Sequence, residues 1–73
     1  MAKVQITGWR RDASKLGADK LIAELSTLSL AESKLAIDTV MEGGSTTIPM
    51  PSEDLAIQLS KALRDMNFDA RPY

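Results

Sequence analysis

The pattern of apolar and polar residues is most regular in the middle of the chain. Small or apolar residues recur there at spacings of three and four: Leu30, Ser33, Ile37, Val40 and Met41. At about 3.6 residues per turn, this spacing lines them along one face of a helix. Ser29 and Glu32 can form a capping box at its start, and Gly43 or Gly44 can take the left-handed conformation that ends a helix. The pattern therefore predicts a helix over residues 30–42.

A second helical pattern precedes this one, between Ser14 and Ser26. Its apolar stripe consists of Leu21, Ile22, Leu25 and Leu28. Because glycine disfavours a helix interior, Gly17 predicts a start at Ala18 or Asp19 rather than at Ser14. A short link separates the two helices, so we expect them to pack as a helical hairpin.

A third helix is predicted after Pro51. Ser52 is a good N-cap, and Glu53 and Asp54 complement the positive N-terminal end of the helix dipole. Apolar residues continue at helical spacing: Leu55, Leu59, Ala62, Leu63 and Met66. Asn67 tolerates the left-handed conformation, so we expect the helix to end there.

Three further stretches have the pattern of strands. Residues 3–8 alternate polar and apolar positions and are rich in β-branched side chains. Residues 45–50 are β-prone but short, and Pro49 cannot donate to a ladder, so this strand must end there or lie at an edge. Residues 68–73 alternate again and are ended by Pro72.

The predicted order is strand, helix, helix, strand, helix, strand. Three apolar helix faces and one small sheet can bury each other only as two layers. We therefore expect a two-layer α+β domain of βααβαβ order, with a three-stranded sheet and three helices on one face. A chain of 73 residues has room for one domain, residues 1–73, with a small core. The predicted core includes Ile37, Val40, Leu55, Leu59 and Leu63.

Composition narrows the class of protein. Hydrophobic residues make up 44% and charged residues 26%, which is ordinary for a soluble globular protein. The longest apolar run is far shorter than the roughly 20 residues of a membrane span, and residues 1–6 lack the apolar core of a signal peptide. We expect a cytoplasmic protein with no membrane contact.

The chain contains no cysteine and no histidine. Their absence excludes disulfides, thiolate or imidazole metal sites, cysteine nucleophiles and every triad with a histidine base. The acidic residues follow the solvent faces of the predicted helices and give no sign of a converging pair. We expect a protein that is not an enzyme, with no catalytic, cofactor or metal site.

The most unusual local feature is the run Trp9, Arg10 and Arg11 in a charged loop predicted over residues 9–14. Residues 1–17 carry four cations against one aspartate, a charge of +3. An exposed tryptophan beside arginines could anchor a partner protein, or stack on a base while the arginines meet phosphates. Alternatively, Trp9 covers the end of the sheet and the arginines are solvated. The net charge of −1 weighs against nucleic acid.

A family resemblance begins at residues 28–34, Leu-Ser-Leu-Ala-Glu-Ser-Lys, which follow a helix rich in Leu and Ile. This segment resembles Leu-Gly-Leu-Lys-Glu-Ala-Lys in the C-terminal domain of the ribosomal stalk protein L7/L12. Residues 51–63 and 67–70 resemble that domain's last helix and strand, and the element order agrees over essentially the whole chain. The related ClpS adaptors share the fold, and residues 29–44 resemble one of their helices. The resemblance implies the βααβαβ fold.

The same resemblance suggests partners. In the stalk domain a basic helical hairpin contacts translation GTPases, and Lys20 and Lys34 match lysines of that surface. The family's Lys and Gly are replaced here by Ala31 and Ser29, and residues 18–42 carry two lysines against five acids, a charge of −3. The ClpS pocket uses an Asn-Asp-Asp segment and a histidine, which this chain lacks.

Three functions therefore stay open. The chain is either a protein-interaction module or adaptor, a nucleic-acid-associated accessory protein using its basic N-terminal segment, or a divergent translation-factor binder. We expect its partner-binding residues among the following: Trp9, Arg10, Arg11, Lys15, Lys20 and Lys34.

Overall fold

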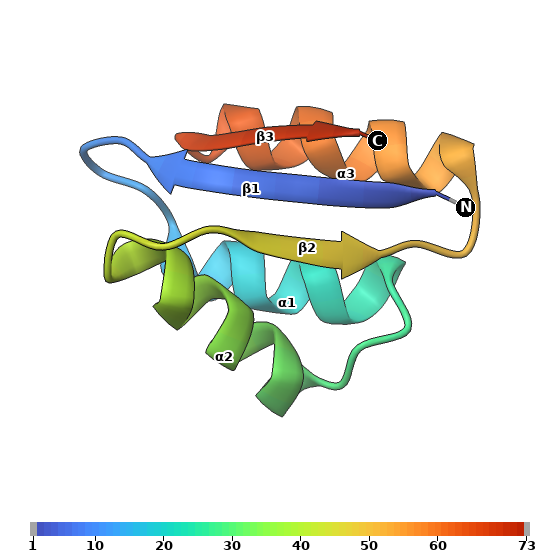
Figure 1. Ribbon diagram of the computed structural model, residues 1–73, viewed down its shortest axis with the longest axis horizontal. Coiled ribbons are helices and arrows are strands. Elements are labelled where there is room, and N and C mark those ends of the chain that lie inside the picture. The colour runs from blue at the N-terminus through green and yellow to red at the C-terminus, as the bar shows by residue number, and fades with distance from the viewer. Residues whose placement is uncertain (1, 73) are drawn as a thin grey trace.

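The computed structural model describes residues 2–72 and has the predicted order of elements (Figure 1). They are β1 (Lys3–Trp9), α1 (Lys15–Leu25), α2 (Leu30–Met41), β2 (Thr46–Pro49), α3 (Glu53–Asp65) and β3 (Phe68–Pro72). The fold is α+β, and the predicted βααβαβ arrangement is confirmed. No helix within residues 2–72 has the length and apolar character needed to cross a membrane.

The sheet has the strand order β2-β1-β3, and β1 is antiparallel to both neighbours. Pro49 lies at the end of an edge strand, as predicted from its missing N–H group. The register of β1 against β3 shifts between Ile6 and Gly8: Ile6 faces Ala70, whereas Gly8 faces Asp69. This β-bulge changes the alternation of side chains near the end of β1.

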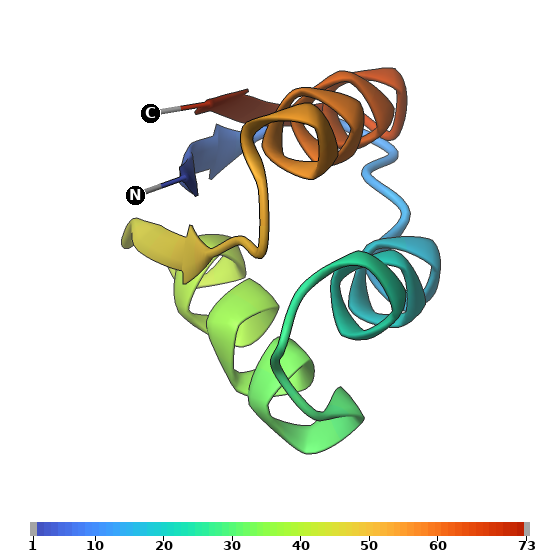
Figure 2. The same cartoon turned by 90° about the vertical axis from the view of Figure 1, so that its right-hand side faces the viewer.

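All three helices lie on one side of the sheet (Figure 2). The helices and the covered face of the sheet bury the core, whose largest members are Val4, Ile6, Ile22, Ile37, Val40, Ile48, Leu59, Leu63 and Phe68. Four of the five predicted core residues are fully buried. Leu55 is the exception: it lies in the first turn of α3, at the margin of the core, and is only partly buried.

The predicted signals for the helix ends are present. The Ser29 hydroxyl accepts from the Glu32 N–H at 3.1 Å, and the Glu32 carboxylate accepts from the Ser29 N–H at 3.0 Å, which completes the capping box. Ser52 accepts from the N–H of Leu55 in the first turn of α3. Gly43 and Asn67 have left-handed backbones, with φ of 98° and 69°. Glycine and asparagine adopt this conformation at the least steric cost.

Two boundaries were predicted wrongly. Helix α1 begins at Lys15 rather than at Ala18 or Asp19, so Gly17 lies inside it. A Cβ at this glycine would lie 2.9 Å from the Ser14 hydroxyl, which would have to move, and 3.5 Å from the Met66 sulfur, an ordinary van der Waals distance. Strand β1 extends to Trp9, which therefore belongs to the sheet and not to the following loop.

Candidate functional site

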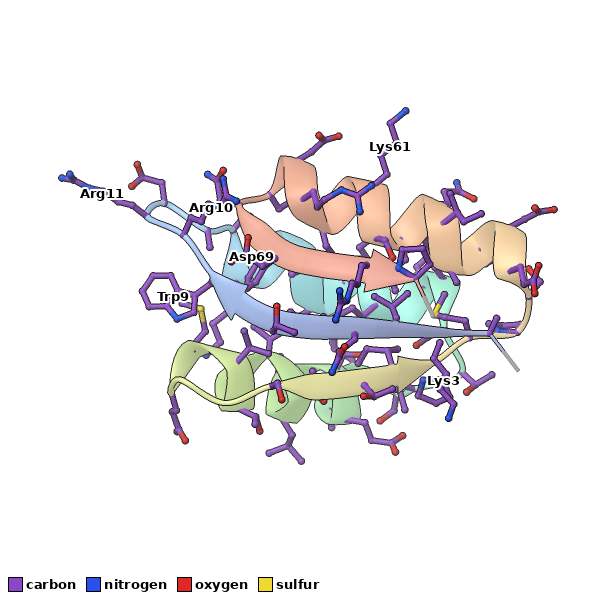
Figure 3. The ribbon with its side chains drawn as sticks, turned by 45° about the horizontal axis from the view of Figure 1, so that its top comes forward. Lys3, Trp9, Arg10, Arg11, Lys61 and Asp69 are labelled. Carbon is purple, nitrogen blue, oxygen red and sulfur yellow. The ribbon has the colours of Figure 1, made fainter. Side chains whose placement is uncertain are left out.

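Trp9 closes β1 at the end of the molecule where the β1–α1 connection begins. The residue paired with Trp9 on the neighbouring strand β3 is Phe68, which is buried. The Trp9 side chain projects beyond the end of β1 on the side of α2 (Figure 3) and remains 43% exposed. Half of this aromatic ring is therefore held by the fold, and the other half is available to a partner.

The two arginines after Trp9 point in different directions. Arg10 turns back to β3, where its Nε lies 3.1 Å from Oδ1 of Asp69, and its backbone N–H donates to the Asn67 carbonyl at 2.7 Å. Arg11 extends away from the body of the protein (Figure 3). The left-handed Asp12, with φ of 68°, follows in the turn. The structure thus separates the arginine pair into an anchored and a solvated member.

Lys15, the first residue of α1, forms a salt bridge with Asp38 of α2. The hydrogen bond to this carboxylate, together with its charge, raises the pKa of Lys15. Both side chains are nearly half exposed, so solvent screens the pair and its contribution to stability is small. Lys15 thus joins the two helices of the hairpin.

The other two predicted lysines lie elsewhere on the hairpin. Lys20 is in the middle of α1 and Lys34 is in the first half of α2, and both are exposed. The structure therefore brings Trp9, Arg10, Arg11 and Lys15 to one end of the molecule. Lys20 and Lys34 are not part of that end.

Leu16 was not among the predicted site residues. It lies in the first turn of α1, directly after the loop, and is 71% exposed. The signal was available in the sequence, because Leu16 is apolar but falls outside the stripe of α1 that contains Ile22. We call Trp9, Arg11 and Leu16 the loop-end surface. It combines exposed apolar groups with a solvated cation.

A buried carboxylate lies between the helices of the hairpin. Asp19 is 1% exposed, and its Oδ1 has no hydrogen-bond partner within residues 2–72. Burial raises the pKa of Asp19, and the charge of Asp38 adds to this effect, whereas Lys15 and Lys34 partly oppose it. The expectation that the acidic residues lie on solvent faces is therefore wrong for Asp19.

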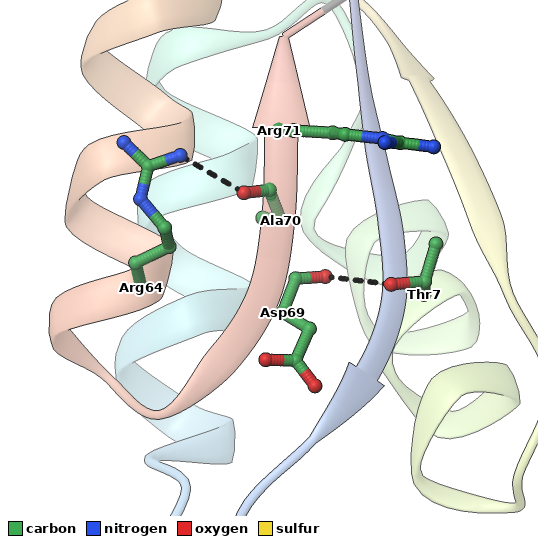
Figure 4. Close-up of a pocket in the computed structure, with 5 residues that line it drawn as sticks. All are labelled: Thr7, Arg64, Asp69, Ala70 and Arg71. Carbon is green, nitrogen blue, oxygen red and sulfur yellow. Dashed lines mark hydrogen bonds between the residues drawn. The ribbon is translucent and has the colours of Figure 1, made fainter.

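A second polar feature lies over β3. Thr7, Arg64, Asp69, Ala70 and Arg71 line an open depression of about 310 Å³ (Figure 4). We call it the Asp69 depression. The sequence does not indicate this depression, because its side chains come from β1, α3 and β3, and only the folded register brings them together.

Residues 2–72 contain no group of three His, Cys, Asp or Glu side chains that could bind a metal ion. No protein-family model matches the chain, and no curated protein matches it significantly. The function is therefore argued from the surfaces described above.

Proposed function

We propose that this chain is a small non-enzymatic protein-interaction module that docks a partner protein through the loop-end surface, Trp9, Arg11 and Leu16. The observation that carries the proposal is the position of Trp9: it is seated on the end of the sheet, yet 43% of its surface is exposed. Tryptophan and arginine are the residues that most often dominate the binding energy of protein interfaces.

The surroundings of Trp9 fit such an anchor. Strand pairing with β3 fixes its backbone, so little conformational freedom is lost when a partner covers the ring. Leu16 adds exposed apolar area in the first turn of α1, after the β1–α1 connection. Among the described residues, Arg11 takes part in neither of the two ion pairs at this end, which join Arg10 to Asp69 and Lys15 to Asp38. These features favour a partner patch with an apolar centre and an acidic rim.

The pairing of Arg10 and Lys15 weighs against nucleic acid as the main partner. Nucleic-acid affinity comes largely from cations that neutralise phosphates. Two of the three cations at this end, Arg10 and Lys15, already lie beside carboxylates. The apolar side chains of the loop-end surface, Trp9 and Leu16, are not engaged by such ion pairs. This difference supports binding to a protein rather than to nucleic acid.

We also propose that the fold is related to that of the stalk-protein and ClpS families. The support is the βααβαβ order and the three helices on one side of the sheet, both of which the resemblance implies. A divergent factor-binding role would use the hairpin lysines Lys20 and Lys34 instead of the loop-end surface. The experiment below separates these two surfaces.

The test is site-specific photo-crosslinking in an extract of the source cells. A photoreactive benzoylphenylalanine is placed at position 9, at position 35 on the outer face of the hairpin, or at position 57 on α3. Leu35 and Ile57 are exposed apolar residues like Trp9, so the three probes are matched. We expect one saturable protein adduct at position 9. A specific adduct at position 35 alone would favour the hairpin, and none at position 9 contradicts the proposal.

Once the partner is identified, its affinity for substituted variants of this chain gives a second measurement. Trp9→Ala should weaken binding roughly thirtyfold, equivalent to about 2 kcal/mol, as expected for a central aromatic anchor. Arg11→Ala should cost less, and mainly at low salt. Tight, salt-sensitive binding to random-sequence nucleic acid that survives Trp9→Ala would instead identify the chain as a nucleic-acid binder.

A further inference from the structure

The Asp69 depression gathers positive charge around one acid. Its floor is the backbone of β3 at Asp69 and Ala70. Arg64 borders it from α3, while Arg71 and Thr7 border it on the open face of the sheet (Figure 4). Arg10 reaches the same acid from the β1–α1 loop. Among the described arginines, only Arg10 contacts the Asp69 carboxylate: Arg64 lies at the outer edge of β3, and the Arg71 side chain extends across β1 (Figure 4). The three guanidinium groups and the one carboxylate together carry a charge of +2.

Arg64 is oriented by the edge of β3. Its Nη1 donates to the carbonyl of Ala70 at 3.0 Å. This bond satisfies an outward-facing carbonyl of the edge strand and holds the guanidinium beside the depression. A guanidinium presents a planar fork of several N–H donors, and the Ala70 bond engages one of them. Its remaining donors can serve an anion.

Asp69 does not make the site acidic, because Arg10 pairs with it. The Arg10 Nε lies 3.1 Å from Oδ1, which compensates the carboxylate's charge from the side of the loop. Thr7 adds a hydroxyl group whose bond to the Asp69 backbone carbonyl is 3.5 Å long. A hydrogen bond of that length is weak, so the hydroxyl can turn toward a ligand with little loss.

We propose that the Asp69 depression binds the phosphate group of a phosphate monoester. Such a group carries close to two negative charges at neutral pH and presents several acceptor oxygens. Arginine matches phosphate by paired N–H···O bonds, and Arg64 can present such a pair beside the depression. Arg71, whose side chain extends across β1 (Figure 4), adds positive charge on the open face of the sheet. The depression is open, so the ester group can extend into solvent. This inference does not rest on the loop-end surface or on the function proposed for it.

The test follows backbone amides by nuclear magnetic resonance during titration of the whole chain at pH 7.5 and low salt. The probes are inorganic phosphate, a phosphoserine peptide and adenosine monophosphate, with chloride at matched ionic strength as the reference. We expect saturable shifts at Thr7 and residues 69–71 with phosphate probes only. Preference for the peptide points to a phosphorylated protein, and preference for the nucleotide to a small metabolite.

Variants decide whether the contacts are the proposed ones. Arg64→Gln should weaken binding about tenfold, because it loses a charge-assisted contact. Arg71→Gln should weaken it less, because it removes a nearby positive charge. Asp69→Asn should tighten it severalfold by removing a like charge. Lys20→Gln removes the same charge from α1, outside the depression, and should change affinity less than about twofold, since exposed charges more than ~10 Å away are screened at moderate salt.

The opposite results overturn the inference. Equal shifts with chloride, or equal weakening by Lys20→Gln and Arg64→Gln, would show general attraction of anions to a cationic surface. Weaker binding in Asp69→Asn would show that the acid does not face the ligand. The amide spectrum itself reports whether each variant is folded. Should Arg64→Gln unfold, Arg71→Gln and Asp69→Asn still decide the question.

Discussion

Replacing Asp19 by Asn should stabilise the protein and remove part of its pH dependence. Asp19 is 1% exposed between α1 and α2, and its Oδ1 lacks a partner within the described residues. A buried acceptor without a hydrogen bond costs about 1–3 kcal/mol, and asparagine would keep that cost, but a buried charged acceptor costs more. Asparagine keeps the shape and removes the charge. We therefore expect Asp19→Asn to raise the free energy of unfolding at pH 7 by about 1 kcal/mol or more, since Lys15 and Lys34 offset part of the charge penalty.

The sign of the pH dependence follows from the raised pKa of Asp19. The folded protein holds this proton more tightly than the unfolded chain, whose aspartates titrate near pH ~4. The stabilisation is complete below that pH and is lost as the pH rises through the folded-state pKa. Glu32 acts in the opposite direction: hydrogen bonds from Ser29 lower its pKa, so its contribution is present above about pH 4 and lost on acidification.

Urea unfolding of the two proteins over a pH series measures the effect. Both contain Glu32, so its contribution cancels in the difference between them. This difference should be small in acid, where Asp19 is protonated, and grow as the pH rises through the folded-state pKa. If the free energies of unfolding of the two proteins ran parallel over the pH series, burial would not raise the pKa of Asp19. A less stable Asn variant at pH 7 would show that the carboxylate makes favourable contacts that outweigh its burial.

Three further expectations concern the fold. Ile37→Ala and Leu59→Ala remove fully buried side chains and should each cost about 2–5 kcal/mol, measured by urea or thermal unfolding; an unchanged melting temperature would mean that the helix faces are assigned wrongly. Ser29→Ala breaks the capping box of α2 and should cost about 1 kcal/mol, whereas Ser45→Ala, in the exposed turn before β2, should change stability by less than about 0.5 kcal/mol; equal effects would contradict the cap's role. Chelators and reductants should leave the melting curve unchanged, because the sequence has no cysteine or histidine; a shift with chelator would reveal a site made of carboxylates alone.

Local sequence signals predicted most of the fold because each lies within a few residues of the feature it determines. Ser29 and Glu32 are three positions apart, and their mutual bonds form within one helical turn. The start of α1 was predicted wrongly because Gly17 packs against Met66, which is distant in sequence. Glycine in a helix interior costs only about 1 kcal/mol relative to alanine, and tertiary packing of α1 can outweigh that cost.

The candidate sites were less predictable because they depend on register and orientation. Trp9 and the arginines after it stand out in the sequence, but nothing there shows that Arg10 turns back to Asp69, 59 positions later. The pairing requires β3 to lie beside β1 with the bulge that sets Gly8 opposite Asp69. The burial of Asp19 likewise depends on how α1 rotates against α2, and helical periodicity specifies that rotation only approximately.

Arg10 connects the two surfaces that we assign to partners. Its backbone belongs to the loop that follows Trp9 and bonds to Asn67, whereas its side chain pairs with Asp69 beside the depression. Removing Arg10 would leave Asp69 without its counter-charge and would also disturb the loop beside the loop-end surface. Loss of binding in an Arg10 variant would therefore not distinguish the loop-end surface from the Asp69 depression. Arg11 and Arg64 each belong to one surface alone, so their variants separate protein docking from phosphate binding.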